Sequence, residues 1–133
     1  MKLTTRSEYA LLALIHLARQ RETGYFTAES IANAQGIPVR FLEQILLALK
    51  RGRYLQSAKG QRGGFRLAKS PETIPLAEII RLFDGALAPT ESVSEYFYES
   101  TPIEREQKLI GVFRSIRDYV AKTLEETTIA DMV

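Results

Sequence analysis

One glycine-rich segment, from Lys59 to Gly64, most constrains what this chain can fold into. It holds three glycines among basic and polar residues, and runs with strand character stand on either side, from Tyr54 to Ala58 and from Phe65 to Ala68. Two such runs joined by a glycine-containing tip predict a β-hairpin. Because the other regular segments have helical spacing, we expect a mainly α fold with one small β-hairpin.

Three helices are predicted before the hairpin. The first spans residues 5 to 20 and has apolar side chains on nearly every face, so it must be covered on more than one side. Thr27 is the predicted N-cap of a short helix from about 28 to 34, which Gly36 ends. Pro38 opens a third helix that Gly52 closes, with apolar residues at helical spacing: Phe41, Leu42, Ile45, Leu46 and Leu49.

A fourth helix is predicted between Pro75 and Gly85. The order of helix, short helix, glycine turn, helix, hairpin and helix is that of a winged helix-turn-helix, which we assign to residues 1–85. The third helix is then the reading helix, sized for the DNA major groove, and the hairpin is the wing, slim enough to follow phosphates or enter the minor groove.

Charge is divided unequally along the chain. Residues 1–70 carry twelve lysines and arginines against four acidic residues, a net charge of +8, whereas residues 71–133 carry six against twelve, a net charge of -6. Between Lys50 and Pro71 there are seven basic residues and no acid. One half of the chain is therefore expected to favour polyanions, and double-stranded DNA is the predicted partner.

Polar residues outside the apolar stripe of the third helix are the candidate DNA contacts. Arginine pairs with guanine, glutamate accepts from cytosine and glutamine bridges adenine, which predicts base reading near the start of the helix. At the wing tip the predicted contacts are to backbone or minor groove. The complete predicted set is Arg40, Glu43, Gln44, Lys50, Lys59, Gln61 and Arg62. Two alternatives stay open: Glu43 in a surface ion pair, and a solvated basic surface.

A long helix is predicted at the end of the chain. Thr101, Pro102 and Glu104 form a capping-box signature for a helix that continues to about Thr127. Its apolar residues form one predicted stripe: Leu109, Phe113, Ile116, Val120 and Leu124. We expect this stripe to be a dimer interface, although it is also compatible with packing on its own domain. The predicted organisation is a DNA-binding domain at 1–85, a linker or effector-type segment at 86–100, and a dimerisation helix with tail at 101–133.

The sequence disfavours an enzyme. It has no cysteine and one histidine, so thiolate nucleophiles and cysteine-ligated metal sites are excluded, and no catalytic spacing is present. His16 lies inside an apolar run, where a packing role is expected. A phosphate-binding loop is disfavoured, because the glycines are not followed by Lys and Ser/Thr. No apolar run is long enough to cross a bilayer, which leaves a cytoplasmic location as the default.

Three stretches of the sequence resemble the Rrf2 family of bacterial transcription regulators: Thr5 to Ala18, Pro38 to Leu46, and Lys59 to Ala68. The resemblance implies a homodimer on a palindromic operator, with the helix containing Glu43 in the major groove and the wing tip near Lys59 in the minor groove. We expect a repressor. A winged-helix module that binds only proteins is the alternative, which the basic wing disfavours.

The chain departs from the family in the segment from Ala86 to Ser100. Many members hold an iron-sulfur cluster there through cysteines, and this chain has none, so no cofactor is expected. Glu8 stands where some members have an extra cluster ligand, and here a surface ion pair is the expected role. Glu91, Glu95 and Glu99 are interpreted as a solvated acidic face or, alternatively, the lining of a site for an unknown effector or partner.

Overall fold

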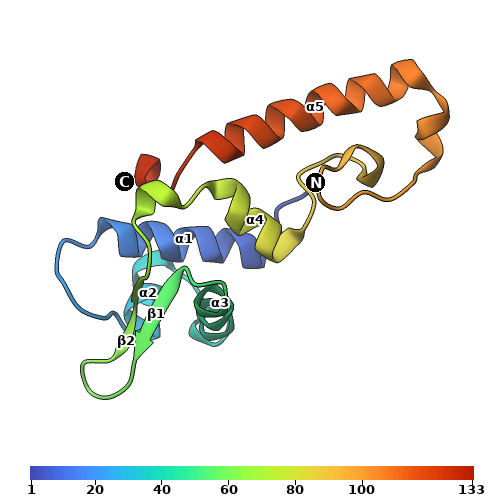
Figure 1. Cartoon of the computed structure of the whole chain (residues 1–133). Coiled ribbons are helices and arrows are strands. Elements are labelled where there is room, and N and C mark those ends of the chain that lie inside the picture. Colours follow the sequence, from blue (N-terminus) through green and yellow to red (C-terminus); the bar gives the residue numbers. More distant parts are fainter.

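The computed structural model describes residues 1–133 and is mainly helical, with one antiparallel pair of strands (Figure 1). Its helices and strands are, in chain order, α1 (Thr5–Arg19), α2 (Ala28–Gln35), α3 (Val39–Arg51), β1 (Leu55–Ala58), β2 (Gly64–Leu67), α4 (Leu76–Asp84) and α5 (Gln107–Glu126). The predicted winged helix-turn-helix followed by a long last helix is confirmed as the fold. None of the helices combines the length and apolar content that crossing a bilayer requires.

The ends of α2 and α3 are set by local backbone chemistry. The Thr27 hydroxyl accepts a hydrogen bond from a backbone N–H of the first turn of α2, as predicted, and Gly36 ends this helix in the left-handed conformation with φ of 66°. Gly52 closes α3 as its C-cap, as predicted. Gly52 keeps a helical φ of -75°, and the left-handed residue is Arg53, with φ of 67°.

The main core forms around α1, which contacts α2, α3 and α4. Ala10, Ala13 and Leu14 of α1 are completely buried, so the prediction that this helix is covered on several sides is confirmed. From α3 the core receives Leu42, Ile45, Leu46 and Leu49. Phe41 was expected in the same stripe, but its side chain is 64% exposed.

The hairpin is anchored at its base and projects at its tip (Figure 1). Leu55 pairs with Leu67 and Ala58 pairs with Gly64 in an antiparallel register. The backbone of Phe65 also exchanges two hydrogen bonds of 2.7 and 2.8 Å with Phe26, in the segment before α2. This third contact fixes the direction in which the wing leaves the domain.

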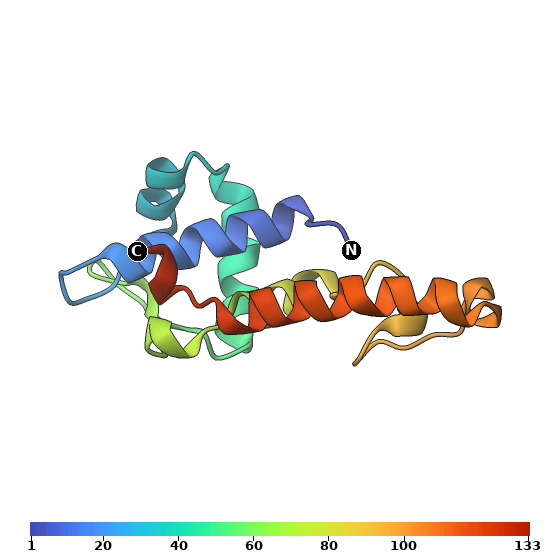
Figure 2. The same cartoon turned by 90° about the horizontal axis from the view of Figure 1, so that it is seen from above.

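The end of the chain differs most from expectation. Pro102–Arg105 form a separate 3-10 turn, and the predicted capping box does not form, because the Thr101 hydroxyl donates instead to Ser92 at 2.6 Å. Helix α5 therefore begins at Gln107. After α5 the tail returns to the first domain, where Ile129 is completely buried in the main core. Seen from above, α5 runs beside that domain and continues beyond it (Figure 2).

Candidate nucleic-acid interface

Helix α3 presents the predicted polar residues to solvent. Its apolar residues recur at positions that form one buried face, so Arg40, Glu43, Gln44 and Lys50 lie on the exposed part of the helix. None of them forms an ion pair, since the two ion pairs of the chain involve only α4 and α5. The alternative of a surface pair for Glu43 is therefore absent from this structure.

The exposure of two apolar residues on α3 was not predicted from the sequence. Phe41 is 64% exposed and Leu47 is 44% exposed, although both have side chains that usually pack in a core. The repeat of apolar residues on α3 is too dense for all of them to face inward. Counting residues at a 3.6-residue period finds this excess, but which side of the helix is buried depends on where α1 crosses it.

The tip of the wing is exposed and free of internal partners. The side chains of Lys59, Gln61 and Arg62 are all exposed and make no hydrogen bond or ion pair within the chain. The turn between them has Gly60 at φ of 99°, a conformation that glycine adopts without strain. These side chains are consequently available to an external partner.

The seven basic residues between Lys50 and Pro71 fall into two groups. Arg66 and Lys69 have structural roles, because Arg66 lies 4.5 Å over the ring of Tyr25 and Lys69 lies 4.6 Å over the ring of Tyr54. The other five have no carboxylate or aromatic partner: Lys50, Arg51, Arg53, Lys59 and Arg62. The positive charge without an internal partner thus lies on the end of α3 and on the wing.

A partly buried hydrogen bond connects the base of the wing to α4. The hydroxyl of Tyr54 donates to the Glu78 carboxylate at 2.9 Å. Burial and this carboxylate raise the pKa of Tyr54 to about 12, so the phenol stays protonated at neutral pH. Two contacts therefore hold the wing to the rest of the domain. One is the hydrogen bond of Tyr54, just before β1, and the other is the backbone pairing of Phe26 with Phe65 of β2.

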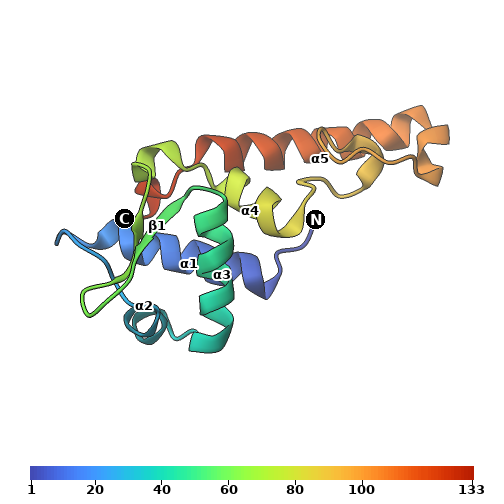
Figure 3. The same cartoon turned by 60° about the horizontal axis from the view of Figure 1, so that its bottom comes forward.

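Helix α3 and the wing both lie on the side of the molecule away from α5 (Figures 1 and 3). A helix with exposed polar side chains beside a projecting basic hairpin matches the shape and charge of duplex DNA, with the helix suited to the major groove and the hairpin to the backbone or minor groove. We call this combined surface the reading face. It is defined by Arg40, Glu43, Gln44, Lys50, Lys59, Gln61 and Arg62.

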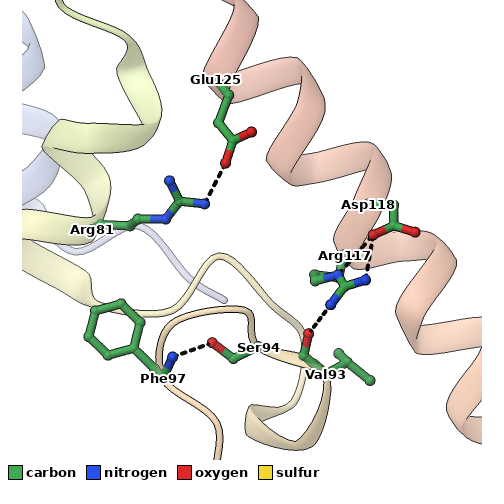
Figure 4. A network of polar contacts seen from close by, with 7 residues as sticks. All are labelled: Arg81, Val93, Ser94, Phe97, Arg117, Asp118 and Glu125. Carbon is green, nitrogen blue, oxygen red and sulfur yellow. Dashed lines mark hydrogen bonds and ion pairs between the residues drawn. The ribbon is translucent and has the colours of Figure 1, made fainter.

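The segment between α4 and α5 is folded against α5 (Figure 4). Arg117 donates to the backbone carbonyl of Val93 at 2.8 Å, and Arg81 pairs with Glu125 at 2.7 Å. The same Arg81 lies 4.8 Å from the ring of Tyr96. Side chains of α4 and α5 therefore both contact this segment. Its predicted acidic face stays exposed: Glu91, Glu95 and Glu99.

The five residues of the predicted stripe on α5 differ in how far their own chain covers them. Phe113 and Leu124 pack against apolar clusters of their own chain, and Val120 is partly buried. Leu109 and Ile116 are exposed, and they continue into two residues that the analysis left out, Val112 and Tyr119. We call Leu109, Val112, Ile116 and Tyr119 the outer stripe; their spacing of 3, 4 and 3 places them on one side of the helix.

Comparisons with known proteins agree with this geometry. The family model described as Rrf2, iron-dependent transcriptional regulator, matches residues 3–133. The chain is 35% identical over 136 residues to the HTH-type transcriptional regulator Rv1287 of Mycobacterium tuberculosis, covering 99% of this chain and 81% of the relative. The solved structure of CymR, the global cysteine regulator of Bacillus subtilis, superposes with a TM-score of 0.79 at 30% identity, covering 99% of this chain and 95% of the other.

The residues of this chain do not fit the iron that the family description names. Cysteine is absent from the sequence, and no three carboxylates or histidines come together in a way that could hold a metal ion. Glu8 is exposed and takes part in neither ion pair of the chain, so the surface pair expected for it does not form.

Proposed function

The chain belongs to the Rrf2 family of transcriptional regulators, and on this premise we propose that it works as a homodimer that represses transcription by binding a palindromic DNA operator. As a DNA-binding regulator it would act beside the chromosome, in the cytoplasm. It would do so without an iron-sulfur cluster, since it lacks the thiolates that hold one.

The reading face is the observation that carries this proposal. Its seven residues are exposed, and its basic members have no internal counter-ion. Burying those charges against protein without neutralising them would be costly, whereas DNA phosphates neutralise them and release condensed counterions. The acidic half of the chain forms α4, α5 and the segment between them, so it stands away from the phosphates.

The roles within the reading face follow from side-chain chemistry. Arg40 is assigned to guanine, Glu43 to the cytosine amino group and Gln44 to adenine, at roughly 1–3 kcal/mol of discrimination for each pairing. Lys50 contacts a phosphate on the wall of the major groove. The wing residues Lys59, Gln61 and Arg62 contact backbone or minor groove, where they contribute affinity more than sequence preference.

The outer stripe of α5 is the proposed dimer interface. Leu109 is 42%, Val112 56%, Ile116 43% and Tyr119 75% exposed. An apolar row of this length on a helix that runs past its own domain leaves a seam that a second copy can cover. Two reading helices related by a twofold axis would then meet half-sites about one turn of DNA apart.

The DNA-binding part is tested by selecting bound duplexes from a random pool and measuring affinity against salt. Affinity must fall steeply as salt rises, because phosphate contacts dominate it; a protein-binding module would show neither selection nor this dependence. Arg62→Ala is expected to weaken binding to all duplexes alike, and Glu43→Ala to change sequence preference. Lys122→Ala, on exposed α5, is the matched control and should change neither. Unchanged affinity and preference in both variants would contradict the assignment.

The dimer is tested by sedimentation. Ile116→Asp places a charge in the outer stripe and is expected to produce folded monomers, because an unpaired charge is costly at an apolar interface. Gln107→Asp introduces the same charge at an exposed position of α5 outside the stripe and should stay dimeric. An intact dimer in Ile116→Asp would remove this interface, and a wild-type monomer would remove the homodimer.

A further inference from the structure

A cavity of about 320 Å³ lies between the start of α1 and the first half of α3. Its walls come from two elements, with Thr5, Arg6 and Tyr9 on α1 and Phe41, Gln44 and Ile45 on α3. Gln44 belongs to the reading face, so the cavity opens directly beside it. Apart from Gln44, none of these residues is among the DNA contacts predicted from the sequence.

Phe41 forms the apolar wall of this cavity that is most open to water. Its side chain is 64% exposed, although it neighbours Leu42, which is completely buried. Three residues further along the helix is Gln44, whose side chain is assigned to a base edge. A large aromatic side chain held this close to a base-reading position has an apolar surface that nothing in the chain covers.

Arg6 supplies the only formal charge in the cavity lining. Its guanidinium lies 5.3 Å from the centre of the Phe83 ring, a contact that restricts where the charge can sit. It pairs with no carboxylate of the chain. The cavity lining therefore contains both an exposed aromatic ring and a cation that has no counter-ion.

We propose that this cavity receives one strand of the DNA beside the reading helix, with Phe41 against the 5-methyl group of a thymine and Arg6 against a neighbouring phosphate. The inference rests on the proposed DNA-binding function and extends the reading face to α1. Phenylalanine is among the side chains that make apolar contact with the thymine methyl in the major groove. Arginine matches the geometry and charge of a phosphate, and Thr5 can donate a hydrogen bond to the same group.

Duplex DNA fits this place better than a small molecule or a second copy does. Binding pockets for small molecules usually enclose most of their ligand, and a cavity with a wall as exposed as Phe41 leaves one side open. Gln44 of the reading face forms part of the cavity wall, so a duplex bound to that face would lie beside the cavity. A second copy is already assigned to the outer stripe of α5, at the opposite end of the molecule.

The thymine contact is tested with an operator obtained by selection. Each thymidine of a half-site is replaced in turn by deoxyuridine, which removes only the 5-methyl group of the base. For one position per half-site the wild type is expected to lose about fourfold in affinity per methyl, the value for one buried aliphatic carbon. Phe41→Ala should bind the thymine duplex and the methyl-free duplex equally well. The effect of removing the thymine methyl would then depend on the presence of the Phe41 ring.

The phosphate contact is tested by salt dependence. Arg6→Gln is expected to lower the slope of log affinity against log salt by about one per protomer, with an unchanged order of preferred sequences. Arg21→Gln, an exposed arginine in the loop after α1, is the control and should leave the slope as it is.

Three outcomes would overturn the inference. The first is a wild type that tolerates deoxyuridine at every position, or a Phe41→Ala variant that keeps the full methyl effect. The second is a Phe41→Ala variant that sediments as a monomer, which would assign the ring to a partner protomer. The third is an Arg6→Gln slope equal to that of the wild type. In all three the wild type still selects an operator, whereas loss of selection by the wild type itself would overturn the proposed function as well.

Discussion

Arg53 adopts a backbone conformation that its residue type disfavours. Its φ is 67°, its N–H donates to Lys50, and the N–H of Tyr54 donates to Leu49, which together close the end of α3. Left-handed geometry costs an L-residue with a side chain roughly 1–2 kcal/mol. Glycine stands one position earlier because a Cβ on Gly52 would lie 3.0 Å from the ring of Tyr54. The sequence shows a glycine at this helix end. It does not show whether that glycine is needed for a left-handed φ or for the close approach of the Tyr54 ring.

Replacing Arg53 by glycine is expected to stabilise the fold. Glycine removes the left-handed strain but loses more backbone entropy on folding, so the net gain should be about 0.5–1 kcal/mol. Arg53→Ala is the matched variant, since it also removes the guanidinium but keeps a Cβ. Urea unfolding of the two variants measures the difference, and equal stabilities would contradict a strained Arg53.

His16 is expected to make stability depend on pH. Burial, together with the nearby charge of Arg19, lowers the pKa of His16 below its ordinary value of 6.5. The unfolded chain therefore takes up this proton first as pH falls. Its contribution to stability is present above pH 6.5 and is lost as pH drops through the lower folded-state pKa. His16→Gln should reduce the fall in unfolding free energy between pH 7 and pH 5, and an identical fall would assign the pH dependence to other groups.

Among the elements, the wing depends on close approach between backbones. A Cβ on Gly64 would lie 2.3 Å from the carbonyl oxygen of Phe26, and the φ of Gly64 is 137°. Gly60, at the tip, has a φ of 99° but nothing within 4 Å of such an atom. The two glycines look alike in the sequence, yet one holds the wing to its base and the other only shapes the turn.

Gly64→Ala is consequently expected to be more harmful than Gly60→Ala. Both variants incur backbone strain of about 1–3 kcal/mol, and only Gly64→Ala must also separate β2 from the segment before α2. Urea unfolding measures the loss of stability in each. Amide hydrogen exchange at Phe26 and Phe65 shows whether the bridge between them opens. Equal destabilisation with a protected bridge would contradict this account.

For helix α5, the sequence predicts that the helix exists but not which of its faces is covered. Its existence follows from apolar spacing, and so does the existence of α1 to α4. The assignment of faces does not, because Phe113 and Ile116 are equally apolar and only the packing of the segment at 86–100 decides that Phe113 is covered. The capping signature at Thr101 failed for a similar reason. Its hydroxyl found a tertiary partner in Ser92, which a local rule does not consider.

At the scale of the whole molecule, the two halves of the chain differ in charge. The basic half carries the reading face and the acidic half carries α5, and this polarity was predictable by counting residues. The residues proposed for DNA contact were also largely predictable, because the basic wing is local in sequence. The cavity between α1 and α3 was not, since Arg6 and Phe41 are brought together only by the crossing of two helices.

The tail joins the two halves into one cooperative unit. The N–H of Ile129 donates to Ile74 at 2.9 Å, and the Ile129 side chain is completely buried among residues of α1 to α4. Both ends of α5 are therefore attached to the rest of the chain, at the segment before it and at the tail after it.

Ile129→Ala is expected to destabilise the whole protein by about 2–5 kcal/mol, the range for removing a large aliphatic side chain from a core. Val133→Ala, at a position that is 64% exposed, should change stability by less than about 0.5 kcal/mol. Unfolding is followed by circular dichroism for the helices together and by amide hydrogen exchange along α5. Because Ile129 packs against the first domain, the two transitions should shift together. An α5 transition that shifts alone would mean that the tail stabilises only its own helix and that the two halves unfold independently.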